Sequence, residues 1–254
     1  MADKLYTYRY PHPAVTTDCC IFSIINNELS ILLVLRGIPP YQNTWALPGG
    51  FMNIDESAEQ CALRELREET GFTAERIRQF HTYTTVERDP RERVITIAFY
   101  ALVKSGRVRG GDDATDARWF PVRNLPKLAF DHHEIIKDAL SALKRDIYFE
   151  PIGFELLPDT FSMAELQKII ESITGEKYDR RNFYNKMRHT RMVEEISQET
   201  PLMMADCSCP TMSDEAEELL KDSVPTRRRG LKYIFNRDAF NKRKDEKGGT
   251  PYSF

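Results

Sequence analysis

The stretch GFMNIDESAEQCALRELREETGF, residues 50–72, is the most informative part of this sequence. It fills every fixed position of the pattern G-x5-E-x7-R-E-U-x-E-E-x-G-U, in which U is a bulky aliphatic or aromatic residue. An isolated E-x-x-E-E motif is more often a solvated acidic helix face. The glycines, Glu56 and Arg64 at their set spacing favour instead a site that holds a metal ion against a diphosphate.

A helix is predicted over residues 58–70. Ser57 followed by Gln60 matches a capping box, and Gly71 stands where a helix would end. Gly49 and Gly50 predict a loop shortly before the helix. We therefore expect the helix to follow a glycine-rich loop that its small residues can approach closely.

Three carboxylates share one side of this helix. At about 100° per residue, Glu68 and Glu69 fall within about 60° of Glu65. Arg64 is predicted to lie roughly opposite. Like charges crowded under a loop repel unless a cation neutralises them. A hard ion such as Mg2+ (or Mn2+) takes carboxylate oxygens while keeping waters and phosphate oxygens, so the sequence predicts a divalent metal site on this side.

Composition limits the class of protein. The 254 residues are 41% hydrophobic, enough for two ordinary cores, and the net charge of -3 gives no global sign of a polyanionic partner. Five cysteines have no disulfide-like spacing, and no apolar run is long enough for a signal or membrane segment. We therefore expect a cytoplasmic protein without a membrane partner. Cys207 and Cys209 are expected to be free thiols in a loop, with half of a metal site as the alternative.

The first part of the chain, residues 1–150, is predicted to be an α/β domain. Strands are expected at residues 15–25, 29–35, 80–86, 94–103 and 117–121. A second, amphipathic helix is expected over residues 131–145, with its apolar side at Ile135, Ile136, Ala139, Leu140 and Leu143. Trp45 and Trp119 are expected in the core.

The second part, residues 151–254, is predicted to contain short helices. A capping box that begins at Ser162 opens a helix ending near Gly175, and Asp179 caps a second helix over residues 180–190. Strands are expected to follow at residues 192–196 and 231–235. Two short helices separated by a turn, the second basic and rich in amides, suit a helix-turn-helix with its second helix in a major groove.

Candidate DNA-binding residues lie on this second helix and on the tip of a predicted wing. They are Arg180, Arg181, Asn182, Asn185, Lys186, Arg227, Arg228 and Arg229. Residues 199–222 form an acidic insert with seven acids and one base, and the rest of the second part carries a net charge of +5. This predicts a salt-sensitive affinity for a double-stranded DNA operator. A dimerisation or packing domain with a solvated charged helix is the alternative.

The pattern in residues 50–72 is the Nudix box, and the first 150 residues resemble a Nudix hydrolase domain. The whole chain resembles the bacterial Nudix-related transcriptional regulators, which join that domain to a C-terminal winged helix. The other segments that carry the likeness are TTDCCIFSI, TVERDPRERVITIAFYALV, GGDDATDARWFPVRNLPKLAFDHHEII, LPDTFSMAELQKIIESITGEKYDRRNFYNKM and RRRGLKYIF. The resemblance implies a Nudix α/β/α sandwich, a winged helix-turn-helix domain and a symmetric homodimer on DNA.

The resemblance also implies a ligand. In this family the Nudix domain recognises ADP-ribose or, in related members, sugars, and the ligand alters DNA binding. Many such regulators have a degraded box and no longer hydrolyse, whereas the box here is complete. Two function classes therefore stay open. One is a Mg2+-dependent pyrophosphohydrolase for ADP-ribose or a similar nucleoside diphosphate derivative that also regulates transcription. The other is a catalytically silent regulator that senses ADP-ribose or a (phospho)sugar.

Roles for single residues follow from the resemblance. The implied metal ligands are the Gly49 carbonyl, Glu65, Glu68 and Glu69. Glu65 would also orient or deprotonate the attacking water, and Glu56 and Arg64 would brace the loop against the helix.

The implied substrate-binding residues are Arg88, Arg91, Asp113 and Phe130. Arg88 and Arg91 belong to a loop that resembles the substrate loop of ADP-ribose-directed members, with a plain β-turn as the alternative. Asp112, Asp113 and Asp116 are candidates for a further carboxylate, and a solvated turn explains each equally well. Phe130, with His132 and His133, would begin the last helix near the ligand pocket, unless these residues only cap a surface helix.

Overall fold

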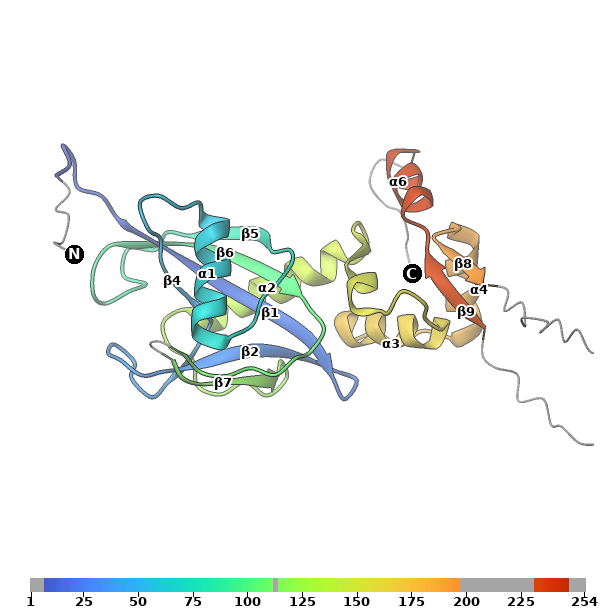
Figure 1. Cartoon of the computed structure of the whole chain (residues 1–254), viewed down its shortest axis with the longest axis horizontal. Coiled ribbons are helices and arrows are strands. Elements are labelled where there is room, and N and C mark those ends of the chain that lie inside the picture. The colour runs from blue at the N-terminus through green and yellow to red at the C-terminus, as the bar shows by residue number, and fades with distance from the viewer. Residues whose placement is uncertain (1–6, 112–113, 197–230, 247–254) are drawn as a thin grey trace, which may run out of the picture.

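The computed structural model describes residues 7–111, 114–196 and 231–246, and Figure 1 shows the arrangement of their elements. The acidic insert, Cys207, Cys209, Asp112, Asp113 and the predicted wing tip at Arg227, Arg228 and Arg229 lie outside these residues. In the described ranges, no helix is long and apolar enough to cross a membrane.

A seven-stranded mixed sheet forms the first part of the molecule. Its strands are β1 (Ala14–Ile25), β2 (Glu28–Arg36), β3 (Trp45–Ala46), β4 (Gly49–Phe51), β5 (Arg78–Tyr83), β6 (Val94–Leu102) and β7 (Ala114–Pro121). The order is β3-β2-β1-β6-β5, and β4 and β7 pair with β1 and β2. Strand β1 runs parallel to β6 and pairs at its two ends with different antiparallel strands, β4 and β2. This long strand places Gly49 directly beside Asp18.

Helices α1 (Ala58–Thr70) and α2 (His132–Asp146) cover opposite faces of the sheet (Figure 1). Because side chains alternate along a strand, Cys19 and Ile21 pack on the α1 side while Cys20 and Phe22 pack on the α2 side. This α/β/α sandwich confirms the predicted fold class. Trp45 and Trp119 are half-buried and pack against these two clusters.

The boundaries of α1 arise from its caps. Ser57 and Gln60 form both hydrogen bonds of a capping box, and Gly71 ends the helix with a φ of 67°. A residue other than glycine is disfavoured in this left-handed conformation. Both predicted signals are confirmed.

The second part contains η1 (Pro151–Leu156), α3 (Met163–Thr174), α4 (Arg180–Thr190), β8 (Val193–Ile196), β9 (Lys232–Phe235) and α6 (Arg237–Glu246). The Ser162 capping box and the Asp179 cap are present as predicted. Strands β8 and β9 pair antiparallel, and Phe161 bridges to Tyr233. Helices α3 and α4 followed by this sheet form the predicted winged helix. Helix α6 was not predicted from the sequence.

A continuous hydrophobic core joins the two parts. Buried Ile135 of α2 and buried Leu166 and Ile170 of α3 belong to one cluster. The junction also contains an ion pair between Arg78 and Glu155, with N and O atoms 2.7 Å apart. The winged helix is therefore packed on the α2 side of the sandwich rather than tethered by a linker alone.

Two predicted strands differ from the observed ones. The strand predicted at residues 80–86 is β5, Arg78–Tyr83, because the chain turns away after its last pair with β6 toward the loop that contains Arg88. The strand predicted at residues 117–121 begins at Ala114, because β7 pairs with β2 as far as Arg36. Both errors come from partner strands, which local periodicity does not register.

Candidate active site

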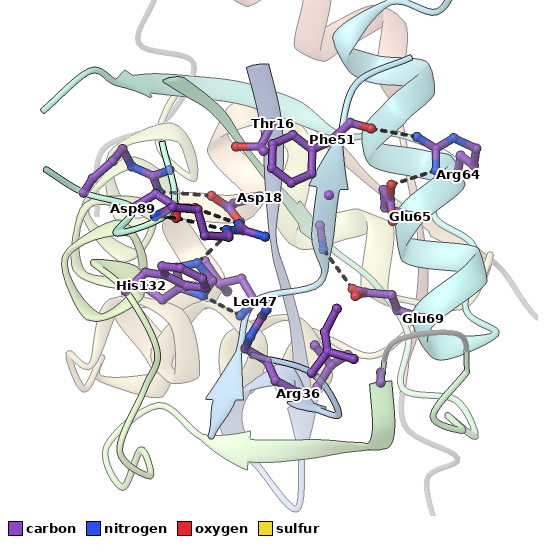
Figure 2. A pocket seen from close by; sticks show the side chains of 18 of the residues that line it. Thr16, Asp18, Arg36, Leu47, Phe51, Arg64, Glu65, Glu69, Asp89 and His132 are labelled. Carbon is purple, nitrogen blue, oxygen red and sulfur yellow. Dashed lines mark hydrogen bonds and ion pairs between the residues drawn. The ribbon is translucent and has the colours of Figure 1, made fainter. Parts of the chain in front are cut away.

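A cleft with a volume of about 450 Å3 opens between β1, β4, α1 and the start of α2 (Figure 2). Its lining includes predicted site residues from four separate segments: Gly49, Arg64, Glu65, Glu69, Arg88, Arg91 and Phe130. Glu56 and Glu68 are not part of the lining, although both contact Arg64. Asp116 pairs with Arg118 at 2.6 Å and does not line the cleft.

The glycine loop lies directly against α1. The Gly49 amide donates a hydrogen bond of 2.9 Å to Glu69 Oε2. A Cβ atom on Gly50 would lie 2.4 Å from Glu65 Oε1, which is closer than real contacts allow. The absence of a side chain at Gly50 therefore lets the Glu65 carboxylate reach the loop.

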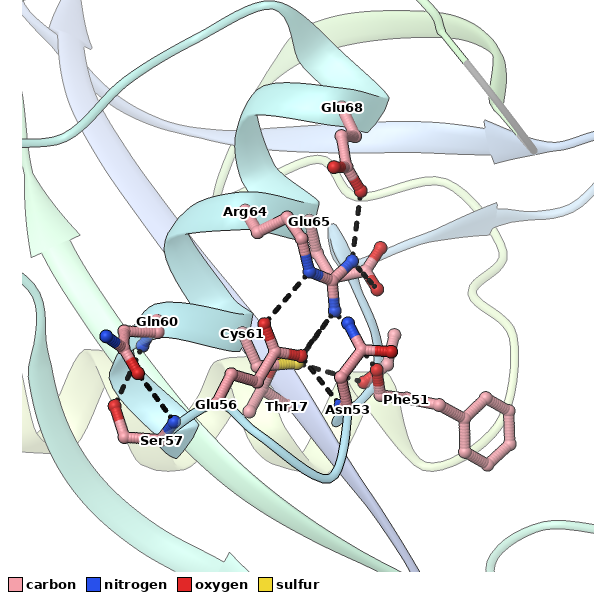
Figure 3. A network of polar contacts seen from close by, with 11 residues as sticks. Thr17, Phe51, Asn53, Glu56, Ser57, Gln60, Cys61, Arg64, Glu65 and Glu68 are labelled. Carbon is pink, nitrogen blue, oxygen red and sulfur yellow. Dashed lines mark hydrogen bonds and ion pairs between the residues drawn. The ribbon is translucent and has the colours of Figure 1, made fainter. Parts of the chain in front are cut away.

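Arg64 binds two carboxylates of α1 and that of Glu56 in the preceding loop (Figure 3). Its guanidinium donates to Glu56 at 2.6 and 3.0 Å, to Glu65 at 2.7 Å and to Glu68 at 2.9 Å. The prediction that Arg64 lies opposite the carboxylates was therefore wrong. Glu68 follows Arg64 by one helical turn, and the long arginine side chain curves back to reach both acids.

The pKa values of Glu56, Glu65 and Glu69 are shifted in different directions. The side-chain hydrogen bonds from Arg64 lower the pKa of Glu56 to about 2. Burial raises the pKa of Glu69 to about 8 and also raises the pKa of Glu65. The two acids that face the cleft therefore resist carrying a negative charge without a neighbouring cation.

The donors in the cleft suit a hard divalent ion. Glu65, Glu69 and the Gly49 carbonyl present only oxygen atoms. Within the described residues no three His, Cys, Asp or Glu side chains form a ready cage. Mg2+ commonly takes one or two carboxylates and completes its shell with water and phosphate oxygens, so two acids in an open cleft match its needs.

A buried polar network forms the floor of the cleft. Asp18 Oδ2 accepts a hydrogen bond of 2.7 Å from Thr96 and lies 3.5 Å from the Arg88 guanidinium. Arg88 also binds both carboxylate oxygens of Asp131, at 2.7 and 2.9 Å. With its side chain only 4% exposed, Arg88 fixes its loop to the start of α2. Its guanidinium is thus largely occupied by protein carboxylates.

His132 belongs to the same network. The Leu47 amide donates to His132 Nδ1 at 2.8 Å, so this nitrogen carries no proton and the neutral ring has its hydrogen on Nε2. That nitrogen lies 3.5 Å from Asp18 Oδ1. Burial lowers the pKa of His132, which favours the neutral ring.

The cleft residues that sequence reasoning missed include Asp18, Arg36 and Phe51. Asp18 had a detectable signal, because a charged residue inside the apolar run TTDCCIFSI must find a partner when the strand is buried. Arg36 ends a strand and Phe51 follows the glycine pair, and their approach to the cleft depends on tertiary packing.

Helix α4 has a different surface. Phe183, Met187 and Thr190 are buried against the winged helix core. Its other predicted residues, Arg180, Arg181, Asn182, Asn185 and Lys186, are all exposed. The helix therefore presents a basic, amide-rich face of the kind that can enter a DNA groove.

Comparison with known proteins identifies a domain in each of the two parts of the chain. Residues 16–139 match the NUDIX domain model, and residues 153–201 match the NrtR DNA-binding winged helix domain model. The ADPR responsive transcriptional repressor NtrR of Acinetobacter baylyi is 32% identical over 194 residues, which cover 74% of this chain and 78% of that protein. An ADP-ribose pyrophosphatase of Methanocaldococcus jannaschii is 44% identical over 135 residues, covering 53% of this chain and 78% of the relative.

Among solved structures, Shewanella oneidensis NrtR complexed with a 27mer DNA superposes with a TM-score of 0.63 at 25% identity. The match covers 89% of this chain and 94% of that chain, so it includes both parts. This chain therefore belongs to the Nudix family, in the group whose Nudix domain is joined to an NrtR-type DNA-binding winged helix.

Proposed function

We propose that this protein is a cytoplasmic, DNA-binding transcriptional regulator whose Nudix domain binds ADP-ribose or a similar nucleoside diphosphate derivative and hydrolyses it with Mg2+ or Mn2+. The observation that carries the proposal is the combination of two sites in one chain. Glu65 and Glu69 face a cleft beside Gly49, and α4 exposes a basic face. Relatives named for ADP-ribose support the choice of ligand.

The proposed chemistry depends on neutralising the diphosphate. A bound divalent ion supplies positive charge and lowers the pKa of a coordinated water. Glu65, Glu69 and the Gly49 carbonyl would hold it, with Glu68 as a further ligand once it leaves Arg64. Glu65 orients or deprotonates the attacking water, while Arg64 and Glu56 keep the loop and helix in register. The rest of the ligand would contact Arg91, Phe130 and Asp113, the last of which lies outside the described residues. Arg88 would hold the loop that contains Arg91.

The DNA half of the proposal rests on charge and shape. Arg180, Arg181 and Lys186 would contact phosphates, and Asn182 and Asn185 are suited to base edges. Arg227, Arg228 and Arg229 would extend this contact from a wing. We also infer a homodimer, because paired recognition helices read two half-sites of a symmetric operator. Light scattering coupled to size-exclusion chromatography measures the mass that checks it.

An assay of purified protein with Mg2+ and ADP-ribose, followed by quantification of AMP, tests the hydrolase. We expect turnover that chelation by EDTA abolishes. Binding of ADP-ribose without turnover on any nucleoside diphosphate would leave the alternative, a silent sensor. Gel-shift titration of an operator with and without ADP-ribose tests regulation, and an unchanged DNA affinity would contradict it.

Slow hydrolysis and sensing are compatible. Cleavage would remove the ligand and return the DNA-binding domain to its ligand-free state. A hydrolysis-deficient variant that still binds ADP-ribose would then keep its response to the ligand but fail to recover with time, which the same gel-shift assay measures after a single addition.

A further inference from the structure

Thr17 of β1 and Cys61 of α1 form a buried contact next to the glycine loop (Figure 3). Thr17 Oγ1 donates a hydrogen bond of 3.3 Å to Cys61 Sγ, and both residues are 0% exposed. Cys61 Sγ in turn lies 3.7 Å from the carbonyl oxygen of Gly50. Neither Thr17 nor Cys61 lines the cleft, so any effect of this contact on the chemistry acts through other groups.

The Cys61 thiol has a proton to donate. Burial raises the pKa of this thiol to about 11, so the S–H group is intact at neutral pH. The thiol can therefore accept from Thr17 and donate to the Gly50 carbonyl at the same time. The Arg64 guanidinium also donates to this sulfur, at 3.6 Å. The result is a connection from β1 through α1 to the glycine loop.

The register of β1 and β4 shows which groups this connection orients. Gly50 lies opposite Thr17 in the antiparallel ladder. The hydrogen-bonded pairs on either side of it are Cys19 with Pro48 and Val15 with Met52. Such pairs alternate with pairs whose backbone groups face away from the partner strand. Gly49 belongs to the second kind, and its amide donates to Glu69 on the side away from β1. Its carbonyl is expected on that side too.

The loop, β1 and α1 fit closely at this point. A Cβ atom on Gly49 would lie 2.0 Å from the backbone oxygen of Thr17, which real contacts do not show. Glu65 follows Cys61 by one helical turn and therefore projects from the same side of α1. A shift at the contact between Thr17 and Cys61 would thus move both the loop and the turn that carries Glu65.

We propose that Thr17 and Cys61 are positioning residues for the divalent metal. Their contact fixes the Gly49 carbonyl relative to the carboxylates of Glu65 and Glu69. This inference rests on the proposed function and adds residues that support the metal ligands from outside the cleft. Removing a group that orients metal ligands commonly changes metal affinity or activity by about 10-fold to 100-fold.

Metal affinity in Thr17 variants tests the inference without depending on turnover. The purified full chain is titrated with Mn2+ alone, and free Mn2+ is quantified by electron paramagnetic resonance. Thr17→Val keeps the branched shape but removes the hydroxyl, so the dissociation constant for Mn2+ should rise about 10-fold or more. Thr17→Ser keeps the hydroxyl, so its dissociation constant should stay within about 3-fold of the wild-type value.

Cys61→Ala tests the other half of the contact. It should weaken Mn2+ binding to a similar extent. The double variant with Thr17→Val should be less than about 2-fold weaker than either single variant, because both changes remove one shared contact. Thermal melting followed by circular dichroism shows whether each variant is folded, and Cys61→Ala carries the test if Thr17→Val does not fold.

Ser23→Ala is the matched control. Ser23 lies on the same face of β1, is 1% exposed, and its hydroxyl has no hydrogen-bond partner within the described residues. The variant therefore removes a buried hydroxyl from the same strand without touching the glycine loop. Its affinity for Mn2+ should equal that of the wild-type protein.

The outcomes separate the two proposals. Unchanged Mn2+ affinity in Thr17→Val and Cys61→Ala overturns the positioning role and leaves the proposed function intact. Equal weakening in Ser23→Ala also overturns it, because loss of any buried hydroxyl on β1 would then suffice. Additive losses in the double variant overturn it as well, since the two residues would act separately. Absence of Mn2+ binding by the wild-type protein overturns the metal site of the proposed function and the positioning role together.

Discussion

The cleft and helix α4 are both rich in arginine, but the arginines compared in the two regions differ in whether they form ion pairs. In the cleft, Arg64, Arg88 and Arg91 each bind a carboxylate within 3 Å. On α4, neither Arg180 nor Arg181 forms an ion pair within the described part of the chain, and both are exposed. Paired, partly buried charges hold a geometry in place, whereas free surface charges act over longer distances and are screened by salt.

The paired arginines of the cleft therefore fix the positions of neighbouring side chains, whereas the exposed arginines of α4 can attract a polyanion such as DNA. Changes in the cleft should alter catalysis strongly and depend little on ionic strength. Changes on α4 should alter DNA affinity in proportion to the phosphates contacted.

The largest effect is expected from Glu65→Gln. The variant keeps the shape of the side chain but loses the charge that we propose holds the metal and orients water, so kcat with Mg2+ and ADP-ribose should fall by about 100-fold or more. Glu59→Gln, on the exposed first turn of the same helix, is the matched control. Retention of more than about half of the activity would remove Glu65 from the proposed mechanism.

The double substitution Arg180→Ala and Arg181→Ala tests the DNA surface. Loss of two phosphate contacts should weaken operator binding by about 10-fold to 100-fold and lower the slope of log K against log salt by about 2. Titrations at several salt concentrations measure both quantities. Lys144→Ala, an exposed position on α2, serves as control. An unchanged slope would show that the N-terminus of α4 does not contact the backbone.

The buried cleft residue His132 should make the folding stability depend on pH. Burial lowers its pKa in the folded protein, so the unfolded chain takes up the proton first as the pH falls below about 6.5. Folding stability should therefore decline on acidification, by up to about 1.4 kcal/mol per pH unit from this residue. His132→Gln should flatten this decline in denaturant titrations between pH 8 and 5. His133→Gln, which is exposed, should retain it, and identical slopes for all proteins would refute the assignment.

The smallest effect on stability is expected at the junction. The Arg78 and Glu155 side chains are 23% and 27% exposed, so Glu155→Gln should cost less than about 1 kcal/mol of folding free energy. Because the pair joins the two parts, the change should reduce the effect of ADP-ribose on DNA affinity more than either affinity alone. Glu28→Gln, whose partner Arg123 lies in the first part, is the control. A full ligand response in Glu155→Gln would assign the coupling to the shared core.

Local signals in the sequence determined much of this molecule. The caps at Ser57, Gly71 and Asp179 depend on neighbouring residues, so the positions of α1 and α4 were predictable. The spacing of the box likewise determined which acids share a helix face. Apolar periodicity predicted an α/β domain followed by short helices, whereas the α/β/α sandwich and the winged helix were expected from the resemblance to the Nudix-related regulators.

Contacts between distant segments decided the rest. Arg64 forms ion pairs with Glu65 and Glu68, and Arg88 forms one with Asp131. In each case the fold brings the carboxylate within reach of the guanidinium. Phe51 and Phe130 are 79 positions apart and meet around Arg91 only when β4 and the start of α2 are in place. Helical and strand periods describe a residue's own element, whereas burial, pairing and stacking depend on neighbours supplied by the whole chain.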